Sequence, residues 1–214
     1  MKYSLLLIAI LLSLGLNAQR FTDGERKLIL SGDTSAMLRV IPLSEPAGQK
    51  ALVSISTDIG FDDPLLPLLK SRMLKAVLDS SRRGVGIAAP QVGINRNLIW
   101  VQRFDKQNQP FEFYINPKIV WRSSVLCIGP EGDLSFEGRG DVVRHFSVMV
   151  SYTDMQGKQH LEVLEDFSAV IFQHETDHLS GTLFTDRIKD QKGKKYVPFS
   201  PVRAKNLLTE EKAE

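Results

Sequence analysis

Cysteine is nearly absent from this sequence: Cys127 is the single thiol among 214 residues. One thiol excludes an internal disulfide and any metal site that needs two thiolates from this chain. An excess of charge is lacking as well, because 27 Lys and Arg stand against 25 Asp and Glu, a formal net charge of +2. Such a balance does not predict binding to nucleic acid. With 43% hydrophobic residues, the composition is typical of a globular protein with a buried core.

The longest apolar run lies at the N-terminus and is short of the roughly 20 residues that span a bilayer. Lys2 precedes the unbroken apolar run Leu5–Leu12, and the small residue Ala18 follows it. This order is typical of a secretory signal. We therefore expect residues 1–18 to direct export to the periplasm or the extracellular space, or to tether the protein to the membrane if the signal is not cleaved.

The rest of the chain shows no repeat and no low-complexity linker, so we expect one domain over residues 19–188. A short helix is predicted over Glu25–Leu30, and the first long helix is predicted to start at Asp62–Pro64 and to end at Gly84. The apolar residues of the long helix recur at spacings of three and four: Leu66, Leu69, Met73 and Val77.

Strands are predicted after this helix, in segments rich in β-branched and aromatic residues. They cover Leu98–Phe104, Phe111–Trp121, Val142–Thr153 and Gln159–Leu164. A second helix is expected over Phe167–Ser180, capped by Asp166 and ended by Gly181. Residues 189–214 are polar and are predicted to form a surface tail. The order of helix, strands and helix predicts an α+β domain.

The second predicted helix contains the pattern H-E-x-x-H, formed by His174, Glu175 and His178. Residues four apart share a helix face, so both imidazoles can reach one ion while the carboxylate stands beside a metal-bound water. The ion lowers the pKa of that water towards ~7, and the carboxylate can take its proton and pass it on. With only four histidines in the chain, a chance match is rare, so a metal site is favoured over two buried core histidines.

A third ligand is still required. Zinc peptidases of the common kind place it downstream, but no histidine follows His178, and the acids within Glu210–Glu214 lie in the polar tail. This weakens the interpretation as a peptidase without removing it.

Two upstream segments also carry motifs. Gly84–Gln91 (GVGIAAPQ) is rich in glycine, but it follows a predicted helix, whereas a nucleotide-binding loop follows a strand and opens a helix. Glu131–Ser135 (EGDLS) lies in a predicted loop between strands.

Together with Gln173–Gly181, these segments resemble, in order and spacing, the three signature motifs of the peptide deformylases over roughly Asp62–Asp186. The resemblance implies antiparallel strands packed around a central helix that carries H-E-x-x-H. It also implies one divalent metal ion, Zn²⁺ or Fe²⁺, and an N-formylated or N-acylated peptide as substrate. The implied activity is removal of the N-formyl group from peptides beginning with formyl-Met.

The resemblance also assigns roles to residues. His174 and His178 would be metal ligands, and Glu175 would be the general acid and base. The side-chain amide of Gln91 and the backbone N–H of Leu134 would polarise the formyl oxygen.

Further roles follow from the same motifs. Gly86 would let the substrate backbone approach closely, and Arg139 would face the substrate. Glu131 is expected to pair with Arg144, although this segment is one residue shorter than the family pattern.

The sequence departs from the family at the third ligand, where Asp133 stands in place of the family cysteine. Thiolate and carboxylate carry the same charge, and a carboxylate oxygen is a competent zinc ligand. Two histidines and one carboxylate also match a set that holds ferrous iron. We therefore expect Asp133 to be the third ligand, and Cys127 to be a small buried residue rather than a substitute ligand. His145 and His160 are expected to be structural or surface residues.

Three hypotheses for the function stay open at this point. The first is an exported, metal-dependent deformylase, and the second is a zinc peptidase or a hydrolase of another N-acyl peptide. The third is a catalytically silent relative that binds peptide or metal. The joint presence of Gln91, Glu175 and the two histidines favours an active enzyme. The oligomeric state is not predicted.

Overall fold

The computed structural model describes residues 19–196, in which antiparallel strands form two sheets flanked by helices. The larger sheet has the order β1-β2-β3-β6-β7, from strands β1 Gly86–Ala88, β2 Leu98–Gln102, β3 Phe111–Arg122, β6 Ser147–Thr153 and β7 Gln159–Glu165. The smaller sheet is the hairpin of β4 Leu126–Asp133 and β5 Phe136–His145. The predicted mixture of helices with antiparallel strands is confirmed.

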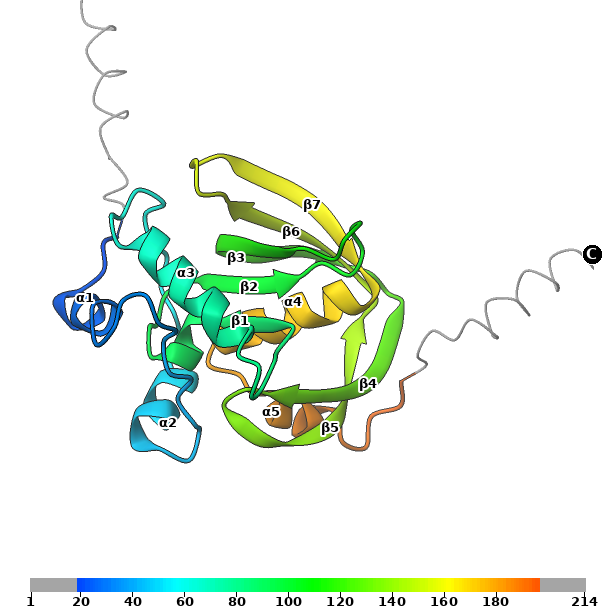
Figure 1. The fold of residues 1–214 in the computed structure, drawn as a ribbon. Coiled ribbons are helices and arrows are strands. Elements are labelled where there is room, and N and C mark those ends of the chain that lie inside the picture. Colours follow the sequence, from blue (N-terminus) through cyan, green and yellow to red (C-terminus); the bar gives the residue numbers. More distant parts are fainter. Residues whose placement is uncertain (1–18, 197–214) are drawn as a thin grey trace, which may run out of the picture.

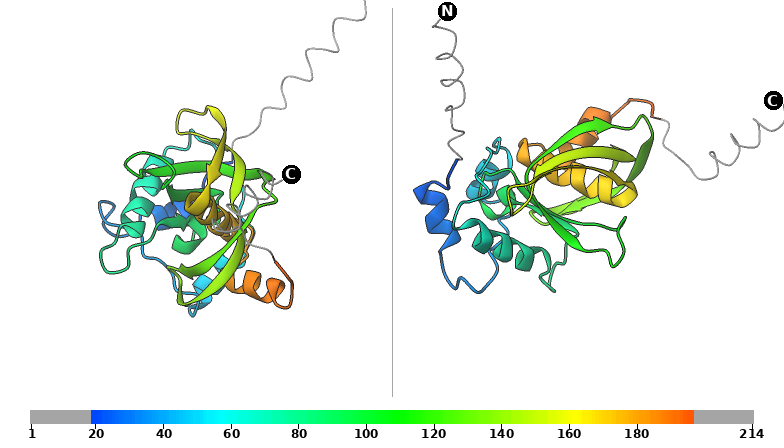
Figure 2. Two further views of the ribbon diagram at one scale, coloured as in Figure 1. Left: turned by 90° about the vertical axis from the view of Figure 1, so that its right-hand side faces the viewer. Right: turned by 90° about the horizontal axis from the view of Figure 1, so that it is seen from above.

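The helices are α1 Asp23–Ile29, α2 Pro46–Leu52, α3 Leu66–Val77, α4 Asp166–Leu179 and α5 Phe184–Gln191, with a 3₁₀ turn η1 at Ala89–Val92. Helix α4 contacts β1, β2 and β7 of the larger sheet and also β5 of the hairpin (Figure 1). Helix α5 packs against β5, as the views in Figure 2 show. The two sheets are therefore joined through α4.

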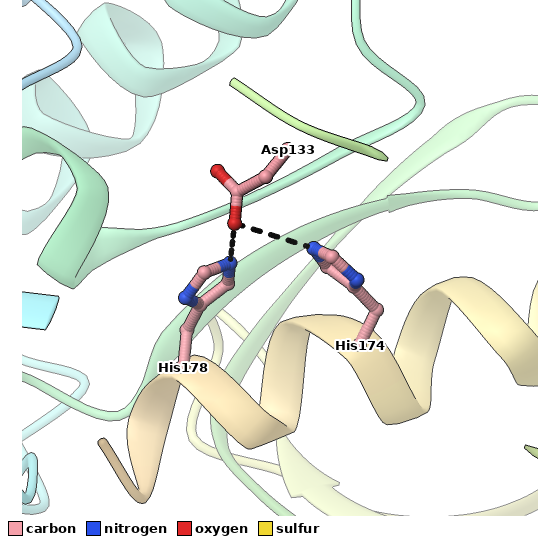
Figure 3. A group of neighbouring side chains, drawn as sticks. All are labelled: Asp133, His174 and His178. Atoms are coloured by element: carbon pink, nitrogen blue, oxygen red, sulfur yellow. Dashed lines mark ion pairs between the residues drawn. The ribbon is translucent and has the colours of Figure 1, made fainter. Parts of the chain in front are cut away.

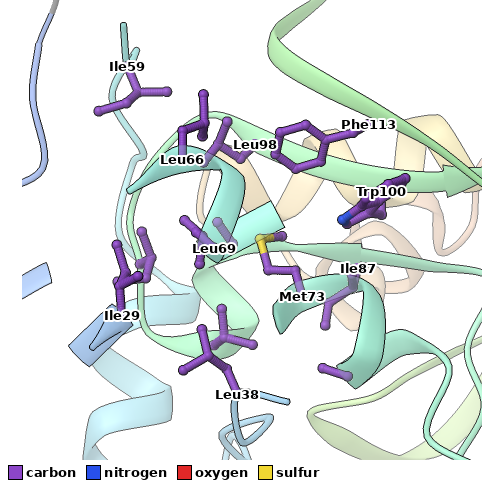
Figure 4. Close-up of a cluster of buried hydrophobic side chains, with 14 of the residues drawn as sticks. Ile29, Leu38, Ile59, Leu66, Leu69, Met73, Ile87, Leu98, Trp100 and Phe113 are labelled. Atoms are coloured by element: carbon purple, nitrogen blue, oxygen red, sulfur yellow. The ribbon is translucent and has the colours of Figure 1, made fainter. Parts of the chain in front are cut away.

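The predicted apolar stripe of α3 forms part of the first core cluster. Leu66, Leu69, Met73 and Val77 are fully buried. They belong to the same cluster as Trp100 and Phe113 of the larger sheet, and Figure 4 shows members of this cluster. Full burial of one such side chain contributes about 1.5–3 kcal/mol, so this stripe holds α3 on the sheet.

Helix α3 ends at Val77, seven residues before the predicted end at Gly84. The side chain of Asp79 accepts hydrogen bonds from the backbone N–H and the hydroxyl of Ser81, which stabilises a turn instead of another helical turn. The loop that follows leads through Gly84 to the first strand, β1. The sequence predicts a glycine-rich loop rather than a strand for this segment.

The predicted single strand Val142–Thr153 is wrong, because the chain forms two strands with Phe146 between them. Strand β5 pairs with β4, whereas β6 pairs with β3 and β7. The hairpin turn between β6 and β7 is confirmed.

The predicted cap of α4 is displaced by one residue. The N-cap is Glu165, which makes no side-chain capping bond, and Asp166 is the first helical residue, with a positive φ of 52°. At the other end the helix stops at Leu179, and Gly181 has φ 69°, as expected of a glycine that ends a helix.

Helix α5 overlaps the start of the predicted polar tail, because helical structure continues to Gln191, past the predicted boundary at residue 189. The side chain of Gln191 accepts a hydrogen bond from the backbone N–H of Val143 and donates one to its carbonyl, while Phe184 is buried. Residues 1–18 and 197–214 lie outside the described residues, so the export signal and the rest of the tail stay predictions. No helix within residues 19–196 is long and apolar enough to cross a membrane.

Candidate metal centre

Three predicted ligands from two elements converge where the end of β4 meets α4. His174 and His178 project from one face of α4 towards Asp133 at the end of β4 (Figure 3). Asp133 Oδ2 lies 3.0 Å from His178 Nε2 and 3.8 Å from His174 Nε2. Ligands at about 2.1 Å from a tetrahedral ion are roughly 3.4 Å apart. The spacing therefore fits one metal ion.

The imidazole of His174 is oriented by a buried ion pair. His174 Nδ1 lies 2.9 Å from Glu131 Oε2, and an N–H there leaves Nε2 as the metal-facing atom. Arg144 donates two hydrogen bonds to the same carboxylate, at 2.7 and 2.8 Å, so the predicted pair of Glu131 and Arg144 is confirmed. Burial alone would raise the pKa of Glu131, but the hydrogen bonds from Arg144 and His174 hold it well below its ordinary value.

This ion pair continues to residues that sequence reasoning missed. Arg144 also donates to Asp177 of α4 at 2.6 Å, and Arg187 of α5 donates two hydrogen bonds to Asp177. A sequence signal was available, because an aspartate beside apolar residues in a buried helix needs a cationic partner. The network fixes α4, β5 and α5 relative to one another.

The carboxylate of Asp133 is held on one side. Its Oδ1 accepts hydrogen bonds from the Ser135 backbone N–H at 2.6 Å and from Gln91 Nε2 at 3.0 Å. Its Oδ2 faces the histidines. Burial opposes the charged form, but the neighbouring His178 and the hydrogen bonds keep the pKa of Asp133 far below its ordinary value. Gln91 thus contacts the predicted ligand, a contact that sequence reasoning missed.

Glu175 is 4% exposed, and its Oε2 has no hydrogen-bond partner among the described residues. Burial raises the pKa of Glu175 to about 7. Its Oε1 packs against the α-carbon of Gly86, where a Cβ would collide with it. The resemblance implies that Gly86 lets the substrate approach, and the structure adds a second reason for glycine at this position.

The donors of the site fit a divalent ion. Both ring nitrogens of His178 are buried without a hydrogen bond within residues 19–196, although Nε2 is close to Asp133. Burial would lower the pKa of His174, yet the hydrogen bond to Glu131 and the nearby carboxylates raise it to about 9. A metal ion would replace that proton at His174 Nε2 and would give the buried Nε2 of His178 a partner. Two imidazoles and a carboxylate suit Zn²⁺ or Fe²⁺.

A cleft of about 740 Å³ opens onto these residues. Leu134, in the turn between β4 and β5, lines it together with Ile171, and the exposed Arg139 lies at its edge. Arg82 donates to the backbone carbonyls of Asp133 and Phe136, 2.9 Å each, which ties the turn to the loop after α3.

The remaining thiol and histidines lie away from the centre. Cys127 is six residues before Asp133 on β4, a span of about 20 Å, and its Sγ contacts the Arg144 carbonyl. It does not join the ligand group of the described residues, so a substitute thiolate ligand is excluded. His145 contacts the Ser123 carbonyl, and His160 pairs with Asp154.

Comparison with known proteins gives consistent matches. The family model described as polypeptide deformylase matches residues 44–194. A peptide deformylase of Synechocystis is 37% identical over 143 residues, which cover 66% of this chain and 75% of that protein. One of Caulobacter is 36% identical over 155 residues, covering 72% and 88%. The Met-Ala-Ser-bound crystal structure of the class I type b peptide deformylase from Acinetobacter baumannii is similar with a TM-score of 0.63, at 35% identity, over 72% of this chain and 99% of that one.

Proposed function

This chain belongs to the peptide deformylase family and is a deformylase-like hydrolase, and from this premise we propose that it removes the N-formyl group from peptides that begin with formyl-Met. The observation that carries the proposal is the convergence of Asp133, His174 and His178 beside the buried carboxylate of Glu175. In this proposal α4 is the central helix that presents the motif.

Members of the family are divalent-metal enzymes. Asp133, His174 and His178 would hold the ion, and Glu131 would keep the His174 ring in the ligating orientation. When bound, such an ion lowers the pKa of a water and polarises a carbonyl oxygen. The donor set accepts either Zn²⁺ or Fe²⁺.

Glu175 moves the proton in this proposal. With a pKa of about 7 its carboxylate is a base near neutral pH. It takes one proton from the water as the water oxygen bonds to the formyl carbon, and the bond between the formyl carbon and nitrogen then breaks. The same proton passes to the leaving amine. The products are a peptide with a free amino terminus and formic acid, which ionises to formate by releasing the second proton of the water to solvent.

The formyl oxygen would lie between two donors. The backbone N–H of Leu134 is one, and the Gln91 amide supplies the other, since it has two hydrogens and gives one to Asp133. Gly86 keeps the cleft wall free of a side chain, and Arg139 would contact the substrate further out. The peptide bound in the Acinetobacter structure supports a peptide as the occupant of the cleft.

The test is formate release by the purified protein, loaded with Zn²⁺ or Fe²⁺, from formyl-Met-Ala-Ser. Glu175→Gln should keep its metal and lose at least 100-fold in rate, roughly the contribution of general base catalysis. Acetyl-Met-Ala-Ser serves as the control for other N-acyl peptides. A metal-loaded wild type that releases no formate would overturn the proposal. A Glu175→Gln rate within about tenfold of wild type, ~1.4 kcal/mol, would reject the role of Glu175.

A further inference from the structure

The two oxygens of Asp133 have different surroundings. Oδ1 accepts two hydrogen bonds, from the Ser135 N–H and from Gln91 Nε2. Oδ2 faces His174 and His178. A thiolate offers one donor atom, whereas a carboxylate offers two and can bind an ion through both. An aspartate in place of the family cysteine therefore adds a second donor atom, Oδ1, which must be prevented from binding the metal.

Gln91 is well placed to hold that oxygen. Its side chain is 1% exposed, and its Oε1 accepts a hydrogen bond from the Ala88 N–H at 2.8 Å. This contact fixes which end of the amide faces Asp133, because a flipped amide would set N–H against N–H and oxygen against oxygen. The Gln91 carbonyl also accepts the Ile41 N–H at 2.8 Å, which anchors the backbone. The amide is thus a rigid donor aimed at Oδ1.

We propose that Gln91 is a positioning residue for the metal site, and that its amide restrains Asp133 to bind through Oδ2 alone. The inference rests on the proposed function in that Asp133 is taken as a ligand. A catalytic site of three protein ligands needs one open position for water or substrate, and a second carboxylate oxygen would fill it. Restraint of Oδ1 keeps that position open.

The proposal is tested by a double-mutant cycle on zinc affinity, measured for the full chain by competition with a chromophoric chelator. The four proteins are wild type, Gln91→Met, Asp133→Cys and the double variant. Methionine has nearly the length of glutamine and no N–H donor. Its lost contact with Ala88 is common to both backgrounds and cancels in the cycle.

In the wild-type background, Gln91→Met should weaken zinc binding about tenfold, as is usual when a group that orients a ligand is removed. In the Asp133→Cys background the same change should alter affinity by no more than about twofold. X-ray absorption of the zinc-loaded proteins gives a second readout. The zinc coordination shell of Gln91→Met should contain one more oxygen than that of wild type. Equal weakening in both backgrounds, or an unchanged shell, would overturn the inference.

These readouts are independent of hydrolysis. A protein that shows the coupling but releases no formate would keep this inference and lose the proposed function. A protein that releases formate but shows no coupling in the cycle would keep the proposed function and overturn this inference. A wild type that binds no zinc overturns the inference as well.

Discussion

Replacement of Gly86 by alanine tests the placement of Glu175 directly. A Cβ built on Gly86 would collide with Glu175 Oε1, and it would lie 2.8 Å from Ile171 Cγ2 and 2.9 Å from Glu175 Cδ. Such contacts are closer than folded proteins tolerate, so the carboxylate or the helix that carries it must move. Glu175 is buried and lies on α4, and its motion is limited by the packing of that helix.

The expected loss follows from the distance. To restore an ordinary contact near 3.5 Å, the carboxylate must shift by about 1 Å, and a misplacement of that size costs roughly 100-fold in rate. Overpacking against Ile171 adds a destabilisation of about 1–3 kcal/mol. The three atoms nearest the new methyl group belong to Glu175 and Ile171, not to a metal ligand. Metal content should therefore be unchanged while kcat/KM falls.

The assay is kcat/KM for formyl-Met-Ala-Ser, with metal content and melting temperature measured on the same samples. Gly132→Ala is the matched control, because its Cβ would have no neighbour closer than 3.5 Å, which is ordinary contact. It should keep activity within a few-fold of wild type. If Gly86→Ala is fully folded and as active as Gly132→Ala, the inferred position of Glu175 is wrong.

Three further results are expected. Arg144→Met leaves the carboxylate of Glu131 buried without its cation and should lower the free energy of unfolding by about 3–5 kcal/mol in urea denaturation; a loss under 1 kcal/mol would contradict the network. Burial opposes the charge of Asp105, but hydrogen bonds from Arg103 lower the pKa of this carboxyl. The charged Asp105 therefore stabilises the folded protein above its unfolded pKa of ~3.9, and this stabilisation is lost as the pH falls through the lower folded pKa. In Arg103→Met, the free energy of unfolding should fall less steeply as the pH is lowered, as measured by denaturation curves at several pH values. An unchanged dependence of this free energy on pH would refute the assignment. Asp133→Cys should bind metal but lose it in peroxide, whereas wild type keeps it, because a carboxylate is not oxidised; equal sensitivity would contradict the ligand exchange.

Much of the fold followed from hydrophobic periodicity, and the missed parts are those that tertiary contacts create. The stripe of α3 and the β6–β7 hairpin were predicted because their local patterns suffice. Helix α5 is polar in sequence and is held by Gln191 on Val143 and by Arg187 on Asp177, contacts that no local pattern reveals. Helix α2 and strand β1 are short elements without a long period to recognise.

The sequence predicted the residues of the candidate site better than the contacts that support them. The ligands His174 and His178 are four residues apart on one helix, and the structure brings Asp133 to them as expected. The contact of Gln91 with Asp133 was missed because the family motif describes a cysteine, which has no side-chain oxygen to accept a hydrogen bond from the amide. The roles of the site residues in metal binding and catalysis stay predictions.

Metal content of wild type and Asp133→Ala, determined side by side by elemental analysis, tests the central claim that Asp133 completes the metal site. We expect close to one zinc or iron ion per wild-type chain and a large loss in the variant, because two imidazoles alone leave the site one ligand short. Equal occupancy of the two proteins would contradict the account.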